Sequence, residues 1–177
     1  PGPGGGDVWR GDGRGWERME VAGTPRLHAV WGAAADDVWA VGDGGVTLRF
    51  DGARFASVPS GTDATLRGVW GASADEVWAV GDAGTILRWD GAEWRHDAAS
   101  GVHAGATLAR VWGEKVRAWV AGRDEDGAAL LLGRAGGDWN RVDADADAGA
   151  LASIHGADGE FYAVGADPDG TGTVLRA

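Results

Sequence analysis

The chain has 177 residues, among them 33 Gly, 11 Trp and no Cys, and its formal net charge is -11. The missing cysteines exclude disulfide frameworks, thiolate zinc sites and cysteine nucleophiles. The acidic charge argues against nucleic acid and anionic membrane as partners. No apolar run approaches the roughly 20 residues of a membrane-spanning helix, so we expect one folded domain without membrane insertion.

The N-terminal stretch combines a linker and a strand-like segment. Residues 1–6 read PGPGGG, which is linker composition, and the domain is expected from 7 to 177. In the segment 8–22, the phrase DGRGW at 12–16 matches DGAEW at 90–94. Because DGAEW leads into the outer strand of its repeat, the first segment is predicted to supply an outer strand as well.

The rest of the chain repeats one phrase. Residues 27–55 read LHAVWGAAADDVWAVGDGGVTLRFDGARF, and residues 66–94 read LRGVWGASADEVWAVGDAGTILRWDGAEW. Diverged copies begin at Leu108 and Leu151. A repeat of about 40 residues is typical of propeller blades.

Local chemistry predicts four short strands in each copy. Apolar segments rich in Val and Trp read as strands, and GDGG or GDAG supplies the positive φ angles of a tight hairpin. We therefore predict an all-β fold, a β-propeller with four blades of four antiparallel strands. The blades are expected at about 27–60, 66–100, 107–145 and 151–177, the last one completed by residues 8–22.

The ends of the chain allow two arrangements. The fourth copy ends without an outer strand, so the N-terminal segment is predicted to complete it and close the ring. However, Val8-Trp9-Arg10 resembles the third strand of a blade, a position that Val174-Leu175-Arg176 also fits. An open array, or a ring closed between chains, therefore stays as the alternative.

The repeated aromatic residues are interpreted as packing between blades rather than as a ligand site. Their fixed positions in the repeat favour burial, with about 150–250 Å² covered for each ring. His155 and Tyr162 stand where the other copies have Trp, and we expect both to be partnered core residues. Arg134 replaces an aromatic residue of the third strand, which predicts a more solvated face in the third blade.

The long loops are the predicted binding surface. Hairpins between second and third strands should emerge on the same propeller face as the connections between blades. Both grow longer in the third and fourth copies, and variable loops on a rigid scaffold often carry binding. The candidate binding residues on these loops are His103, Arg123, Asp124, Glu125, Asp126, Asp167 and Asp169.

One loop has metal-ligand spacing. Asp143, Asp145 and Asp147 alternate before a glycine, as oxygen ligands do in calcium loops. The loop has one residue too many before its glycine and no glutamate at the far end. A solvated acidic edge strand, which also deters aggregation, gives the same alternation. Calcium therefore stays a candidate cofactor beside the alternative of none.

Catalytic motifs are absent from the sequence. No serine has a nucleophile-elbow context, and the four histidines lack a spacing such as HExxH. Carboxylates are abundant but lie mostly on turns, where a shifted pKa is not expected. We expect a protein that is not an enzyme.

The repeat phrase resembles known propeller families. The pattern VWGxxxxDVWAVGxxGTILRWDGxxW is similar to repeats of bacterial surface propellers, of sialidase-like Asp-box proteins and of photosystem II assembly-factor propellers. Asp12, Asp51 and Asp90 precede glycine without the Ser or Thr of an Asp-box, so the resemblance implies a fold rather than glycan chemistry. It also implies a location outside the cell or in the cell envelope.

The sequence thus predicts a non-catalytic binding or assembly module. Its partner would be a protein or a glycan, recognised through the acidic loops of one face. The alternative is a purely structural or self-assembling module of a larger surface protein, with a second copy of the chain as partner. A glycoside hydrolase is the third hypothesis.

Overall fold

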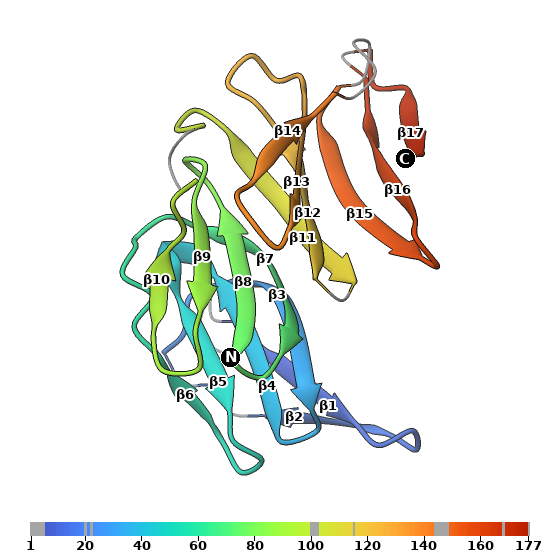
Figure 1. The fold of residues 1–177 in the computed structure, drawn as a ribbon. Helices are drawn as coiled ribbons and strands as arrows, with labels where there is room; N and C mark the ends of the chain where they lie inside the picture. The colour runs from blue at the N-terminus through green and yellow to red at the C-terminus, as the bar shows by residue number, and fades with distance from the viewer. Residues whose placement is uncertain are drawn as a thin grey trace.

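A computed structural model describes residues 6–19, 21, 23–99, 103–114, 116–143, 149–167 and 169–176. Antiparallel sheets follow one another along the chain and form a fan (Figure 1). Among the described residues the helical structure is one short 3₁₀ turn, Asp43–Gly45. None of these residues belongs to a helix long and apolar enough to cross a bilayer. The all-β prediction is confirmed.

The chain begins with a two-stranded hairpin and continues with three complete sheets, each pairing its strands in chain order. The hairpin consists of β1 (Val8–Gly11) and β2 (Trp16–Met19). The first complete sheet contains β3 (Leu27–Ala34), β4 (Asp37–Gly42), β5 (Thr47–Phe50) and β6 (Phe55–Ser57). The second contains β7 (Leu66–Ser73), β8 (Glu76–Gly81), β9 (Ile86–Trp89) and β10 (Trp94–His96).

The third and fourth copies differ in strand number. The third sheet contains β11 (Thr107–Glu114), β12 (Arg117–Arg123), β13 (Ala129–Ala135) and β14 (Asn140–Val142). The last sheet has three strands, β15 (Leu151–Ala157), β16 (Glu160–Ala166) and β17 (Gly172–Arg176). The first strands of consecutive sheets, β3, β7, β11 and β15, lie next to one another along the inner edge of the fan.

The predicted closure of the ring is not confirmed. Strand β2 pairs with β1 rather than with the last sheet. The hairpin and β17 lie at opposite ends of the fan (Figure 1). Arg10 of the hairpin lies over the Phe50 ring, 5.8 Å from its centroid, so the hairpin packs beside the first complete sheet. The prediction of four complete blades is likewise not confirmed.

Aspartate side chains form the turns between third and fourth strands. Oδ1 of Asp90 accepts the backbone N–H groups of Ala92 and Glu93, both at 3.0 Å. Asp12 and Asp51 make the same two bonds in their own turns. The hairpin β1–β2 is therefore built like the outer half of a blade.

The recurring glycine at the end of each second strand has a steric cause. A Cβ on Gly42 would lie 2.0 Å from the carbonyl oxygen of Arg26. A Cβ on Gly81 would lie 2.0 Å from that of Thr65. The backbone comes this close because the next residue, Asp43 or Asp82, donates its N–H to the same carbonyl at 2.9 Å. The glycine that marks each repeat is thus required by strand pairing.

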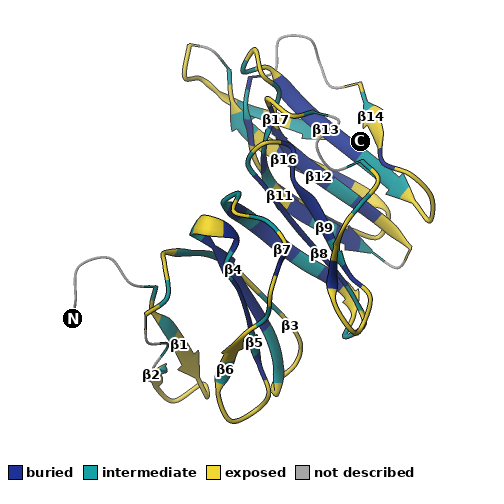
Figure 2. Cartoon of the chain, turned by 90° about the vertical axis from the view of Figure 1, so that its left-hand side faces the viewer, coloured by how far each residue is buried: buried dark blue, intermediate teal, exposed yellow. Residues whose placement is uncertain are grey.

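The core lies between the sheets, as predicted for the tryptophans. Trp39 and Trp78 are buried, and Figure 2 shows that the deepest burial follows the middle sheets. The Trp94 ring packs edge-on against that of Trp39, with centroids 5.0 Å apart. Side chains of neighbouring sheets therefore interlock, and each sheet depends on the next for its burial.

The expectation of a more solvated third sheet at Arg134 is wrong. The Arg134 guanidinium forms a mostly buried ion pair with Asp97, 3.2 Å from its carboxylate, and lies over the Trp78 ring at 5.5 Å. Asp97 follows the last strand of the second sheet, so the pair links two sheets. The charge replaces an aromatic residue because it has a partner inside the interface.

Candidate functional site

The predicted long loops do gather on one face. The hairpin glycine Gly84 approaches the carbonyl oxygen of His103, because a Cβ there would lie 2.4 Å from it. The connection glycine Gly105 in turn approaches the Glu125 side chain. Connections between sheets and hairpins between second and third strands therefore share this side of the fan.

An acidic cleft opens between two of these loops. Its volume is about 410 Å³, and the connection 103–106 forms one wall. The hairpin residues Asp124, Glu125 and Asp126 form the other wall, with Arg141 at its end. The cleft thus brings together four of the predicted binding residues, three carboxylates and His103.

Asp124 holds the loop and is not free to bind. Its Oδ1 accepts the backbone N–H of Ala128 at 2.9 Å, and its Oδ2 accepts from Arg141 at 3.1 Å. Burial raises the pKa of Asp124, but these hydrogen bonds outweigh it and leave the pKa below its ordinary value. Sequence reasoning missed Arg141, which lies on β14 and contacts the hairpin only in the folded sheet.

Glu125 and Asp126 are the exposed carboxylates of the cleft. Neither forms an ion pair within the described part of the chain. His103 faces them from the opposite loop and is half-buried. The cleft therefore offers two negative charges to a ligand and one imidazole that donates or accepts a hydrogen bond.

The other predicted binding residues lie elsewhere. Arg123 is exposed at the end of β12 and does not line the cleft. Asp167 uses its carboxylate within its own hairpin, where Oδ1 accepts from the backbone N–H groups of Asp169 and Thr171. Asp169 is exposed in the turn between β16 and β17. The structure does not join the fourth hairpin to the cleft.

The calcium hypothesis stays a prediction. Asp145 and Asp147 lie outside the described residues, and Asp143 is exposed. Among described residues no cluster of three or more His, Asp or Glu side chains is arranged to hold a metal.

Ion pairs line the inner edge of the fan, a feature that sequence reasoning missed. His28 Nε2 lies 2.5 Å from Asp43 Oδ1, and Arg67 pairs with Asp82 at 2.5 Å at the same position of the next sheet. The hydrogen bond from His28 lowers the pKa of Asp43, and nearby positive charges of Arg67 and Arg26 act in the same direction. The available signal was a His or Arg that recurs on the first strand together with an Asp that follows the second strand.

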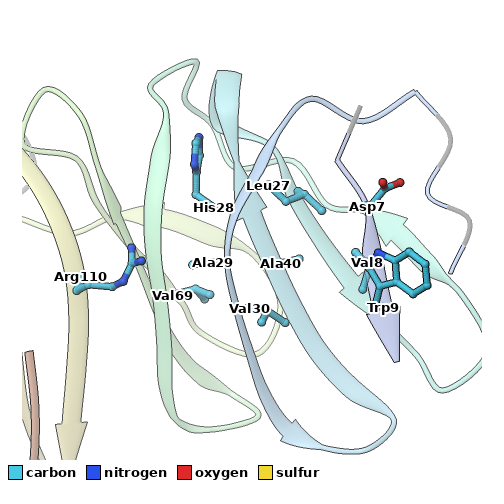
Figure 3. Close-up of a pocket in the computed structure, with 10 residues that line it drawn as sticks. All are labelled: Asp7, Val8, Trp9, Leu27, His28, Ala29, Val30, Ala40, Val69 and Arg110. Atoms are coloured by element: carbon cyan, nitrogen blue, oxygen red, sulfur yellow. The ribbon is translucent and has the colours of Figure 1, made fainter. Parts of the chain in front are cut away.

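A second hollow lies beside β3. Its volume is about 470 Å³, and Figure 3 shows Val8 and Trp9 on one side with Leu27, Ala29 and Val30 on β3. Arg110 lies at its far end and donates to the carbonyl oxygen of Arg67 at 2.7 Å. This groove is more apolar than the acidic cleft. It lies between the hairpin β1–β2, which has only two strands, and the exposed face of β3.

Two of the expectations for aromatic replacements are wrong. His155 and Tyr162 were expected in the core, but both are exposed on the outer face of the last sheet. The Tyr162 hydroxyl donates to Glu160 at 3.1 Å, which raises the pKa of Tyr162. His155 keeps one aromatic partner, because its ring lies edge-on to that of Trp112 with centroids 5.2 Å apart.

Solved structures with a similar fold are β-propellers. YCF48 from Cyanidioschyzon merolae matches with a TM-score of 0.59 and 22% identity, over 73% of this chain and 44% of that one. A structure of YCF48 bound to D1 peptide matches with a TM-score of 0.63 and 18% identity, over 86% of this chain and 51% of that one. The chain thus spans about half the length of these neighbours.

No protein-family model and no curated protein matches the sequence. The structural likeness supports the resemblance to photosystem II assembly-factor propellers at the level of fold, and it gives the Asp-box resemblance no support. At these identities the comparison shows architecture alone. The chain has the fold of a β-propeller segment that presents an acidic loop face and an apolar groove.

Proposed function

We propose that this chain is a non-catalytic propeller module that binds a segment of a protein partner at the acidic cleft. One observation carries the proposal. Glu125 and Asp126 are exposed and form no ion pair within the described part of the chain, and they face His103 across a cleft of about 410 Å³. A cleft of this size accommodates a few side chains of an extended peptide. The D1 peptide bound to the neighbour YCF48 supports a protein partner over a glycan.

The cleft chemistry defines the segment it would take. Two carboxylates beside one another attract a Lys or Arg side chain, whereas Arg141 is already occupied by Asp124. The loop backbone is held by Asp124, so the cleft is preformed and little ordering entropy is lost on binding. We expect a basic residue to enter between Glu125 and Asp126, with His103 contacting the neighbouring backbone.

A peptide array that varies in net charge and in Lys and Arg position tests this proposal. Peptides with a basic residue should bind, and Glu125→Gln with Asp126→Asn should weaken binding about tenfold, which corresponds to roughly 1.4 kcal/mol. The matched control is Asp36→Asn with Asp138→Asn, which removes the same charge from exposed turns on the other side of the fan.

The control distinguishes the effect of charge in the cleft from the effect of the protein's net charge. Long-range attraction of a basic peptide depends on the net charge and not on where the charged residues lie. If the control weakens binding as much as the cleft variant, the cleft is not the site. Binding of sugars without binding of any peptide would overturn the proposal of a protein partner.

A further inference from the structure

The two interfaces between complete sheets are built on one plan. The first interface lies between β3–β6 and β7–β10, and the second interface lies between β7–β10 and β11–β14. At the first interface the Trp39 and Trp89 rings meet with centroids 4.8 Å apart. At the second interface the Arg134 guanidinium lies over the Trp78 ring at 5.5 Å. In both, a second-strand Trp meets a third-strand residue of the next sheet, so the two interfaces can be compared position by position.

Strand pairing shows that Trp89 and Arg134 are equivalent. Trp89 lies opposite Val77 in the second sheet. Arg134 lies opposite Ala118 in the third sheet. Val77 and Ala118 each directly precede the Trp of their second strand. The same position therefore presents an aromatic ring at the first interface and a guanidinium at the second.

Val58 and Asp97 are equivalent as well, because each follows the outer strand of its sheet. Val58 donates its backbone N–H to the carbonyl oxygen of Thr47 at 3.0 Å. Asp97 donates its own to the carbonyl oxygen of Ile86 at 2.9 Å. Both acceptors are the first residues of third strands. This position is therefore apolar in the first sheet and acidic in the second.

The exchanges at these two positions match each other. Val58 packs against the apolar cluster of the first interface, which contains Trp89. At the second interface Oδ2 of Asp97 accepts a hydrogen bond from Nη1 of Arg134 at 3.2 Å, and the side chains are 12% and 14% exposed. A whole apolar pair is thus replaced by a whole ion pair, so the buried guanidinium has its carboxylate.

Another cation is common to both interfaces and does not distinguish them. Arg49 lies 5.3 Å from the ring centroid of Trp39, and Arg88 lies 6.0 Å from that of Trp78. Each of these arginines pairs with an acid at the start of its own second strand. Among these contacts, the chemical difference lies at the two matched positions.

We propose that the ion pair of Asp97 and Arg134 determines the order in which the sheets stack. A third sheet placed on the first would bury the Arg134 guanidinium beside Val58, which offers no negative charge. A second sheet placed on the second sheet of another molecule would bury the Asp97 carboxylate beside Trp89. An ionised group that is buried without a partner is costly, so both wrong orders are disfavoured.

The repeat explains why the chain needs such a pair. Residues 27–55 and 66–94 are nearly the same phrase, so the first and second sheets offer almost the same surfaces during folding. Apolar attraction is non-directional and discriminates poorly between similar surfaces, whereas a desolvated charge rejects a partner that lacks the opposite charge. The pair lies between two sheets that each have a neighbour on both sides. The proposal does not rest on binding at the acidic cleft.

A double-mutant cycle tests the pairing. Asp97→Val and Arg134→Trp give the second interface the residues of the first. Each substitution alone leaves a buried charge, whereas the two together restore an apolar pair. In urea titrations we expect a coupling of about tenfold or more between their effects on the unfolding equilibrium constant. The hydrogen bond from the Ala99 N–H to Asp97 cancels in the cycle, because it is lost in both variants that lack Asp97.

A second cycle covers the case in which Arg134→Trp does not fold. Arg134→Met replaces it there, because methionine is unbranched and adapts to irregular space. Effects that add without coupling would mean that the two charged groups do not depend on each other. That result would overturn the proposal.

Exchanging the chemistry of the two interfaces tests the stacking order. Asp97→Val with Arg134→Trp makes both interfaces apolar. Val58→Asp with Trp89→Arg makes both interfaces charged. The fourfold variant that combines all these changes again has two different interfaces, in exchanged positions. Every one of these variants keeps the net charge of -11, so a change in long-range repulsion does not explain a difference between them.

Sedimentation velocity after refolding from urea measures wrong stacking, because sheets that stack on those of another molecule join the two chains. Both double variants should contain severalfold more associated protein than the parent at the same concentration. The fourfold variant should return to the level of the parent. If the double variants refold with no more association than the parent, or if the fourfold variant associates as strongly as they do, the proposal is overturned.

Discussion

At the scale of single residues, backbone geometry explains where glycine is needed. In the hairpin of the second sheet Ala83 has a φ of 56°, a left-handed conformation that favours glycine. Its counterpart Gly44 in the first complete sheet has a φ of 64°, and a Cβ added there would have no atom within 4 Å. The two positions differ in residue type at nearly the same backbone geometry.

We expect Ala83→Gly to stabilise the fold and Gly44→Ala to destabilise it, each by about 1 kcal/mol, because an L-residue costs roughly 1–2 kcal/mol in this region. Urea unfolding of both variants measures the change. Gly45→Ala should destabilise the fold more strongly, since its Cβ would lie 1.9 Å from the carbonyl oxygen of Thr62. Equal effects of the three substitutions would contradict this explanation.

The pKa of a turn aspartate differs from what its position in the sequence suggests. Hydrogen bonds from the backbone N–H groups of Glu93 and Ala92 lower the pKa of Asp90. The expectation that turn carboxylates have unshifted pKa values is therefore wrong here. The ionised form is favoured because it accepts two backbone hydrogen bonds.

This shift predicts a pH dependence of stability. A carboxyl whose folded pKa is depressed adds stability that is present above its ordinary pKa, near 3.8, and is lost as the pH falls through the lower folded value. Asp90→Asn keeps the turn but removes the titration. We expect it to be less stable than the parent at neutral pH and equally stable in strong acid, as measured by urea unfolding across pH. A difference that persists unchanged in strong acid would contradict this.

At the scale of the elements, each sheet is held by contacts with its neighbours rather than by its own strands. Trp31 of the first sheet lies against Gly71 of the second, and the buried pair of Arg134 and Asp97 links the second sheet to the third. A four-stranded sheet in isolation would leave such side chains in water. The repeat is therefore stable only when its copies stack.

Glycines at the interface give an element-scale prediction. Gly71→Ala places a methyl group 2.6 Å from the Trp31 ring, and overpacking of this kind costs about 1–3 kcal/mol. Gly32 is the counterpart in the first complete sheet, where no preceding Trp lies against it. Thermal unfolding should show a larger loss for Gly71→Ala than for Gly32→Ala. The reverse order would contradict the proposed role of the Trp–Gly contact.

At the scale of the whole molecule, stability should fall from the middle of the fan to its ends. Strands β8 and β12 lie between neighbouring sheets, whereas the hairpin β1–β2 and strand β17 have mostly exposed side chains. Figure 2 shows the same gradient of burial. Local opening is easiest where few apolar contacts are lost.

Amide hydrogen exchange measures this gradient. We expect the slowest exchange in β8 and β12 and the fastest in β1, β2 and β17 at low protein concentration. Uniform exchange along the chain would mean that the sheets open as a single cooperative unit.

Most of the architecture was predictable because its causes are local and repeated. Alternating Val and Trp segments mark the strands, and Asp-Gly turns at 12–13, 51–52 and 90–91 mark the outer hairpins. The loop face was predictable for the same reason, and it brought His103 near Glu125. The roles of Asp124 and Asp167 were not predictable, because whether a carboxylate binds its own loop depends on hairpin geometry.

The sequence by itself determined the repeat, its strands, the glycine near the end of each second strand and the packing of most tryptophans between sheets. Only the tertiary structure decided which face of each sheet has a neighbour. It placed β2 beside β1, left Tyr162 and Val30 exposed, and buried Arg134 beside Asp97. The physical reason is that turn and strand preferences act between residues close in sequence, whereas burial is decided by partners that only the stacking of sheets brings into contact.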